Sequence, residues 1–272
     1  MARIAHLLRQ FRLAFLASCL AAGAPVMAGA PADPLASPIW AHRLAEVLGP
    51  SADVRVDPRL KLLVPVVTED QRSFPVLVDG RALAAVQRLI VLVDLNPLPV
   101  PLDLDLPDAE PFVALRIRLD QRTPVRALAQ LADGTWVAHG VWVDAAGGGC
   151  SLPPVSRARA DWAQGLGQAQ ARAFVDSDGG VRLRARLRHP MDTGFVADAP
   201  LYHLDRLDVR DAQGRPLARA RIQASLAEDP VLTLKPRARP GDTLVVEAVD
   251  TGGIRYAAKA AVPAVALQTA GR

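Results

Sequence analysis

Short segments with a period of two constrain the fold of this chain more than any other feature. Val181 to Leu187 has an apolar residue at every second position and an arginine at each position between. Successive side chains of a β-strand point to opposite faces, so this segment predicts a strand with one apolar and one charged face. Phe112 to Leu119 alternates in the same way and is predicted to turn Arg116 and Arg118 towards solvent.

Similar segments recur along the chain with turn residues between them. Asp133-Gly134, for example, separates two such runs as a hairpin turn would. The further predicted strands are Leu60 to Val67, Phe74 to Val78, Gln87 to Asp94, Val125 to Leu131, Trp136 to Val143, Ala171 to Val175, Leu201 to Val209, Leu217 to Ile222, Leu244 to Val249 and Ile254 to Ala260. Only Ser37-Pro38 to Gly49-Pro50 has a helical pattern. The chain is therefore predicted to be all-β, with two β-sandwiches.

The first thirty residues have the pattern of an export signal. Three arginines precede an apolar stretch, Leu13 to Ala24, that is too short to span a bilayer, and Ala28-Gly29-Ala30 follows as a cleavage site. We expect residues 1–30 to be removed and the protein to be periplasmic. The alternative is a lipoprotein anchored through Cys19, because Leu16 to Cys19 resembles a lipoprotein processing site. No later stretch predicts a membrane span.

Removal of this segment leaves the chain nearly neutral. Three of its 32 basic residues and none of its 28 acidic residues lie in the signal, which leaves a net charge of +1. The chain therefore offers no argument for nucleic-acid binding.

Removal of the signal also changes the cysteine count. Cys19 would leave with the signal, and Cys150 would have no partner. An unpaired cysteine in an exported protein indicates a reactive thiol or an intermolecular bond. Gly147, Gly148 and Gly149 precede it, and Pro153-Pro154 follows shortly after. We expect this segment to be an exposed, flexible arm, with a thiol pKa near the usual value of about 8.5.

A second dense cluster is His189-Pro190-Met191-Asp192-Thr193-Gly194. One histidine and one methionine are too few to hold a soft metal, so the cluster is predicted to be a turn and not a metal site. No nucleophile elbow or phosphate loop is present in the sequence. We expect no cofactor and no catalytic activity, which favours a carrier or binding role.

At this point the motifs resemble two known families. Val91 through Asn96-Pro97, Phe112 to Leu119, Val125 to Trp136 and the following Gly-Gly-Cys resemble SoxY, the sulfur-carrier subunit of thiosulfate oxidation. The residues that resemble SoxZ, its partner subunit, are His189, Pro190, Met191, Asp192, Thr193 and Gly194, the Asp211 to Arg215 turn, and Leu244 to Gly252. The order and spacing resemble fused SoxYZ-like carriers associated with quinoprotein dehydrogenases.

The resemblance implies two immunoglobulin-like β-sandwich domains joined by the glycine-cysteine arm and a linker. It implies that Cys150 holds a sulfur intermediate covalently and presents it to periplasmic redox enzymes that load and unload it, among them a quinoprotein dehydrogenase or cytochromes. Two departures stand out. Ser151-Leu152 replaces the Gly-Gly that follows the family's cysteine, and Cys150 is internal, so its arm is held at both ends.

The predicted organisation is a signal peptide over 1–30, a helical segment over 31–50, a SoxY-like domain over 51–146, the arm and linker over 147–167, a SoxZ-like domain over 168–266 and a tail over 267–272. Two alternatives to a covalent carrier remain open. One is a non-covalent partner or assembly factor of a periplasmic dehydrogenase. The other is a homodimer linked through Cys150.

Overall fold

The fold is that of a computed structural model, which describes residues 33–65 and 67–264. The predicted signal and tail lie outside these residues. The elements of the first half are α2 (Trp40–Leu48), β1 (Val54–Val56), β2 (Lys61–Leu63), β3 (Phe74–Asp79), β4 (Val86–Val93), β5 (Leu102–Asp105), β6 (Ala109–Ile117), β7 (Thr123–Leu131) and β8 (Trp136–Val143). Those of the second half are the 3₁₀ turns η1 (Val155–Ala158) and η2 (Trp162–Gly165), then β9 (Ala169–Val175), β10 (Val181–Leu187), β11 (Leu204–Asp211), β12 (Pro216–Ile222), β13 (Val231–Pro236), β14 (Thr243–Asp250) and β15 (Arg255–Ala261).

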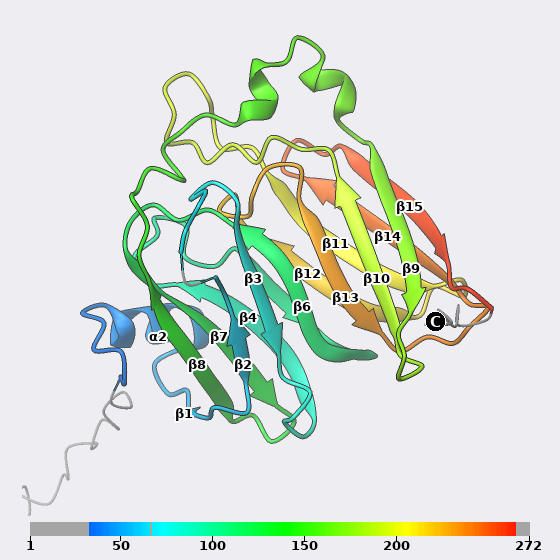
Figure 1. The fold of residues 1–272 in the computed structure, drawn as a ribbon, viewed down its shortest axis with the longest axis horizontal. Helices are drawn as coiled ribbons and strands as arrows, with labels where there is room; N and C mark the ends of the chain where they lie inside the picture. The colour runs from blue at the N-terminus through cyan, green and yellow to red at the C-terminus, as the bar shows by residue number, and fades with distance from the viewer. Residues whose placement is uncertain (1–32, 66, 265–272) are drawn as a thin grey trace, which may run out of the picture. The chain divides into compact units, whose positions relative to one another are not determined.

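The strands of the described chain form two sheets, as Figure 1 shows. One sheet has nine strands in the order β1-β8-β7-β4-β5-β12-β11-β14-β15, and the other has six in the order β2-β3-β6-β13-β10-β9. The all-β sandwich predicted from the alternating segments is confirmed.

Both sheets run without interruption from the first half into the second. In the nine-stranded sheet β5 pairs antiparallel with β12, with Leu104 opposite Ala220. In the six-stranded sheet β6 pairs antiparallel with β13, with Ala114 opposite Thr233. We call this double junction the seam. It joins the two halves by backbone hydrogen bonds in addition to side-chain packing, which the sequence did not predict.

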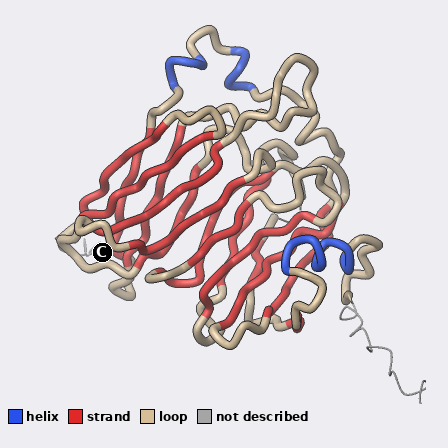
Figure 2. The backbone as a smooth tube through the Cα atoms, turned by 180° about the vertical axis from the view of Figure 1, so that it is seen from behind, coloured by secondary structure: helices blue, strands red, loops and turns tan. Residues whose placement is uncertain are grey.

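The hydrophobic core is also continuous across the two halves of the chain. A single cluster of buried apolar side chains fills the space between the sheets in both halves, from Phe74 and Val113 to Leu207 and Tyr256. A smaller cluster lies on the outer face of the nine-stranded sheet, where α2 packs Trp40 and Leu44 against it. Figure 2 shows this helix against the strands. The helix predicted between Ser37-Pro38 and Gly49-Pro50 is present at Trp40–Leu48, and the structure adds that it covers one face of the sheet.

The sequence did not predict β1, β5 and β13, and the last two are strands that complete the seam. β5 is the run Leu-Asp-Leu-Asp between prolines, and β13 follows Pro230 directly. Prolines signal loops in a sequence, because they cannot donate to a strand ladder. β2 is also shorter than the predicted Leu60 to Val67, since it ends at Leu63, shortly before Pro65. Within the described ranges, no helix is long and apolar enough to cross a membrane.

Candidate functional site

The glycine arm folds back against the segment that follows β6. The backbone N–H groups of Gly148 and Gly149 donate to the carbonyls of Asp120 and Leu119, at 3.1 and 3.0 Å. The Gln71 side chain donates to the Gly147 carbonyl at 2.8 Å. Gly147 and Gly148 have φ values of 102° and 82°, which L-residues with side chains rarely adopt. The glycines therefore make a tight turn here, where the sequence predicted a flexible tether.

Gly149 shows how closely the arm is packed. A Cβ atom at this position would collide with the carbonyl oxygens of Gln71 and Leu119, which are backbone atoms that cannot move independently. Only glycine fits between the arm and this segment. The glycine next to the cysteine thus permits the arm to dock against this segment.

Cys150 is fully buried and its thiol is free. Its backbone N–H donates to the Asp120 carboxylate at 3.2 Å, and its carbonyl accepts from the Thr193 hydroxyl at 2.5 Å. Burial, with a smaller contribution from the charge of Asp120, raises the pKa of the thiol to about 12. The predicted exposed thiol with an ordinary pKa is therefore wrong for the docked arm. The reason is that the arm is packed against the rest of the protein and contacts the second half of the chain.

The His189-to-Gly194 turn, which we call the HPMDTG turn, supplies that contact. Thr193 binds the arm directly. Asp192, which is buried, forms an ion pair with Arg157 of η1. Gly194 has a φ of 77° and packs against Leu201. The two motifs that the sequence placed in separate halves thus meet, and the structure assigns the turn a role at the interface with the arm.

His189 of this turn serves a structural purpose. Its Nδ1 accepts a hydrogen bond from the Met191 N–H at 2.9 Å, which leaves the ring proton on Nε2, 3.6 Å from the buried carboxylate of Asp250. That carboxylate accepts a hydrogen bond from the Tyr202 hydroxyl at 2.7 Å. Burial lowers the pKa of His189 to about 4, so the ring is neutral at pH 7.

Met191 is likewise occupied, because its sulfur accepts from the Leu204 N–H at 3.5 Å. In the part of the chain that the structure describes, no three His, Cys, Asp or Glu side chains gather in a group that could hold a metal ion.

Arg118 is the site residue that the sequence placed wrongly. It was predicted to face solvent with Arg116, but it is 1% exposed. Strand β6 ends at Ile117, so the alternation no longer determines where the next side chain points. The guanidinium donates to the carbonyls of Gly149 at 3.2 Å, Pro190 at 3.2 Å and Met191 at 3.3 Å. Arg118 therefore connects the arm to the HPMDTG turn across the seam.

The linker beyond the arm is also anchored to the second half. Glu228 accepts from the N–H groups of Val155 and Ser156, at 3.1 and 2.9 Å, and from the Ser156 hydroxyl at 2.8 Å. Arg157 stacks over the ring of Trp162, with its guanidinium carbon 3.7 Å from the ring centroid. The arm is thus held at both ends by defined contacts.

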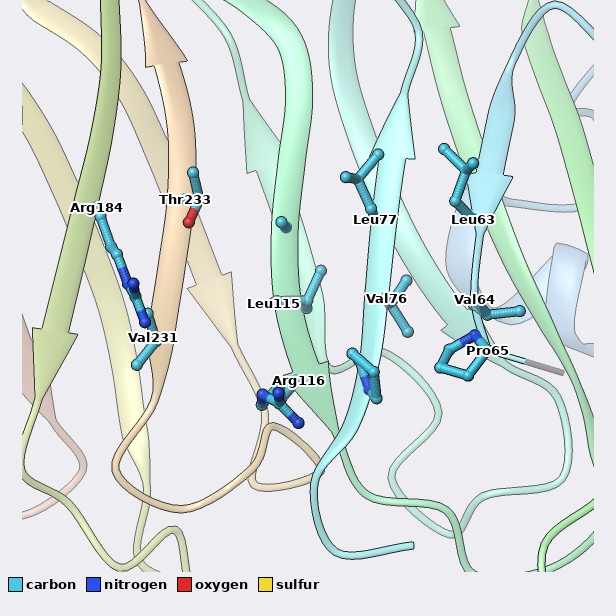
Figure 3. A pocket seen from close by; sticks show the side chains of 12 residues that line it. Leu63, Val64, Pro65, Val76, Leu77, Leu115, Arg116, Arg184, Val231 and Thr233 are labelled. Carbon is cyan, nitrogen blue, oxygen red and sulfur yellow. The ribbon is translucent and has the colours of Figure 1, made fainter. Parts of the chain in front are cut away.

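A groove of about 480 Å³ lies elsewhere, on the outer face of the six-stranded sheet. Figure 3 shows apolar side chains such as Leu63, Pro65 and Leu77 along it, with Arg116 and Arg184 beside them. It crosses the seam from β2 to β10. Cys150 does not line this groove, so it is separate from the cysteine site.

Two family models match the chain, and they match it in succession. The family described as Sulfur oxidation protein SoxY matches residues 44–150, and the one described as Sulphur oxidation protein SoxZ matches residues 171–261. The SoxY match ends at Cys150 itself. No curated protein matches the chain.

Solved structures resemble parts of the chain with low TM-scores. The sulfur carrier protein SoxY of Chlorobium limicola f thiosulfatophilum is 19% identical over 39% of this chain and 90% of its own, with a TM-score of 0.35. The Bacteroides ovatus mixed-linkage glucan utilization locus protein SGBP-B is 12% identical over 75% of this chain and 45% of its own, with a TM-score of 0.22.

A SoxY domain followed by a SoxZ domain defines a carrier protein of the sulfur-oxidation class. The chain belongs to these two families, joined in one polypeptide: it is a fused SoxYZ-like carrier.

Proposed function

We propose that this protein is a periplasmic covalent carrier, which holds a sulfur intermediate or another thiol-linked group on Cys150 and presents it to partner enzymes. One observation carries the proposal: Cys150 ends the SoxY match and lies in contact with the SoxZ turn through Thr193. The chemistry suits the role, because a thiolate accepts sulfur readily and the resulting disulfide-type bond is reversible. The export pattern of residues 1–30 supports the periplasmic location.

The buried thiol gives the carrier two states. In the docked state the thiol is protonated and covered, so it is protected from oxidation and from unintended exchange. Loading and unloading then require the arm to leave its site. A periplasmic redox enzyme, such as a quinoprotein dehydrogenase or a cytochrome, would bind the released arm in its own cleft and activate the thiol there.

Intact mass measurement tests this function directly. Protein purified from periplasm without reductant is expected to carry an adduct that reductant removes, and the Cys150→Ser variant is expected to lack it. The mass of the adduct would identify the cargo. An unmodified wild-type protein, together with a fully functional Cys150→Ser variant in cells, would contradict the proposal.

The burial of Cys150 also favours a second candidate function. A thiol with its pKa raised to about 12 is a poor nucleophile, which suits a non-covalent partner or assembly factor of a periplasmic dehydrogenase. This candidate predicts that Cys150→Ser supports the dehydrogenase as well as wild type does. Dehydrogenase activity in cells that express each form separates the two functions.

A further inference from the structure

Arg118 carries a buried charge for which the docked arm supplies no opposite charge. Its three hydrogen-bond acceptors are all backbone carbonyls, and its Nε–H, which is buried, has no partner in the described structure. None of the ion pairs formed among the described residues includes Arg118. A buried guanidinium without a carboxylate is costly, because burial removes its hydration and carbonyl dipoles replace it only in part.

The carboxylates whose charges act on Arg118, and that of Asp120 two residues along the chain, already have other partners. Asp192 pairs with Arg157, and Glu228 accepts three hydrogen bonds from Val155 and Ser156. Asp120 accepts from the Cys150 N–H and from the Ser151 hydroxyl. Two further groups act on the guanidinium: Arg72, which is itself a cation, and Cys150. Arg118 already donates to the carbonyl of Gly149, the residue before Cys150.

We propose that Arg118 is the positioning residue for a negatively charged group on Cys150, and that the docked site thereby holds an anionic group more tightly than a neutral group of similar size. This inference rests on the proposed carrier function. When the group is attached, the guanidinium exchanges the Gly149 carbonyl for a charged acceptor, and the unpaired Nε–H gains a partner. Hydrogen bonds between ions are shorter and stronger than those to carbonyls, so an anionic group is held at the seam and a neutral one is not.

Synthetic adducts of similar size and different charge test this inference. Methanethiosulfonate reagents install sulfonatoethyl, hydroxyethyl or trimethylammonioethyl groups on Cys150. The thiolate attacks the sulfenyl sulfur, a disulfide forms, methanesulfinate leaves with the bonding electrons, and the thiol proton passes to the buffer. Intact mass confirms complete loading. The neutral reductant tris(hydroxypropyl)phosphine then removes each group, and the rate of removal reports how well the group is held.

In the wild-type protein we expect the anionic adduct to be reduced about tenfold more slowly than the neutral one, and the cationic adduct to be reduced faster than the neutral one. Arg118→Gln is expected to bring the ratio of the anionic to the neutral rate close to one, and Arg118→Lys to restore part of it. Arg116→Gln is the matched control, since it removes the same charge two residues earlier from an exposed side chain. It is expected to leave the ratio unchanged.

Equal reduction rates for the three adducts on wild type would overturn the inference, and so would a preference that survives in Arg118→Gln. If Arg118→Gln does not fold, the order of the three adducts on wild type decides alone. The outcome is independent of the natural cargo. If the periplasmic protein carries an adduct but the three synthetic adducts are reduced at equal rates, the carrier function stands and the role of Arg118 does not. If the rates differ with charge but no periplasmic adduct is found, the role of Arg118 stands and the carrier function does not.

Discussion

The burial of one thiol determines how this carrier responds to pH. Docking raises the pKa of Cys150 to about 12, well above that of a free thiol, so the docked arm binds the neutral thiol and excludes the thiolate. A pKa raised on docking stabilises the docked arm fully below pH 9, and this stabilisation is lost as pH rises towards 12. Reactivity therefore depends on release of the arm as well as on ionisation.

We expect the rate of Cys150 alkylation by iodoacetamide to keep increasing with pH beyond pH 9. The docked thiol stays protonated up to about pH 12, so the fraction of released, ionised thiol continues to grow over this range. The measurement is the alkylation rate between pH 7 and 11, followed by intact mass. In urea-unfolded protein the same rate should level off near pH 9. A native profile that also levels off there would mean that the thiol is not docked in solution.

His189 makes a separate contribution at acidic pH. Its pKa falls from 6.5 to about 4 on folding, so it stabilises the fold fully above pH 6.5, and this contribution is lost as pH falls towards 4. The resulting decrease in the free energy of unfolding amounts to about 3 kcal/mol at most. Urea unfolding at pH 7 and pH 4.5 measures it. The His189→Asn variant, whose amide oxygen still accepts from the Met191 N–H, should be less stable at pH 7 and should lose less stability between the two pH values.

At the scale of elements, the arm depends on the close approach of two backbone segments. Gly149 lies against the carbonyls of Gln71 and Leu119, and the arm then reaches the HPMDTG turn through Cys150. Both carbonyls lie outside the strands, since β3 begins at Phe74 and β6 ends at Ile117. We therefore expect a side chain at position 149 to release the arm without unfolding the sandwich.

Gly149→Ala is expected to expose Cys150 and to raise its alkylation rate at pH 8 at least about tenfold, while the thermal midpoint changes little. Gly148→Ala is the matched control, because its Cβ would meet only the Leu152 side chain, at 3.8 Å. It adds strain at a φ of 82° without a backbone collision. An equal rate increase in both variants would show that strain in the turn, not the collision at position 149, governs docking.

Across the whole molecule, the seam holds the halves together, and the linker is secondary. Leu104 and Ala220 are both buried where β5 pairs with β12. Outside this pair, Arg221 reaches Asp103 and Asp105 at 3.0 and 3.1 Å. These exposed pairs contribute at most about 1 kcal/mol each, so the paired strands and the shared core dominate the junction.

We therefore expect a chain cut once in the linker, between Arg159 and Ala160, to remain one particle in gel filtration at pH 7. A protease site inserted there allows the cut after purification. Leu104→Ala in the cut protein removes buried contacts worth about 2–5 kcal/mol and should promote separation of the halves. Separation of the cut protein without that substitution would show that the linker, not the seam, maintains the assembly.

The sequence predicted those features that depend on local periodicity and on residue type. The alternation of apolar and polar residues predicted the strands at β3, β4, β10 and β14, and the resemblance predicted the order of the two domains. Cys150 could be singled out from the sequence because an unpaired cysteine after three glycines is rare. The turn at His189 could be singled out as well, although its contact with the arm could not.

The tertiary structure alone decided where the arm lies and what surrounds it. Contacts between Cys150 and Thr193, or between Arg118 and Pro190, join residues far apart in the chain, and no local period encodes them. The same holds for β5 and β13, whose short runs become strands because partners in the other half pair with them. The sequence by itself therefore determined the all-β class and the cysteine. Only long-range packing decided that the thiol is buried beside an unpaired arginine.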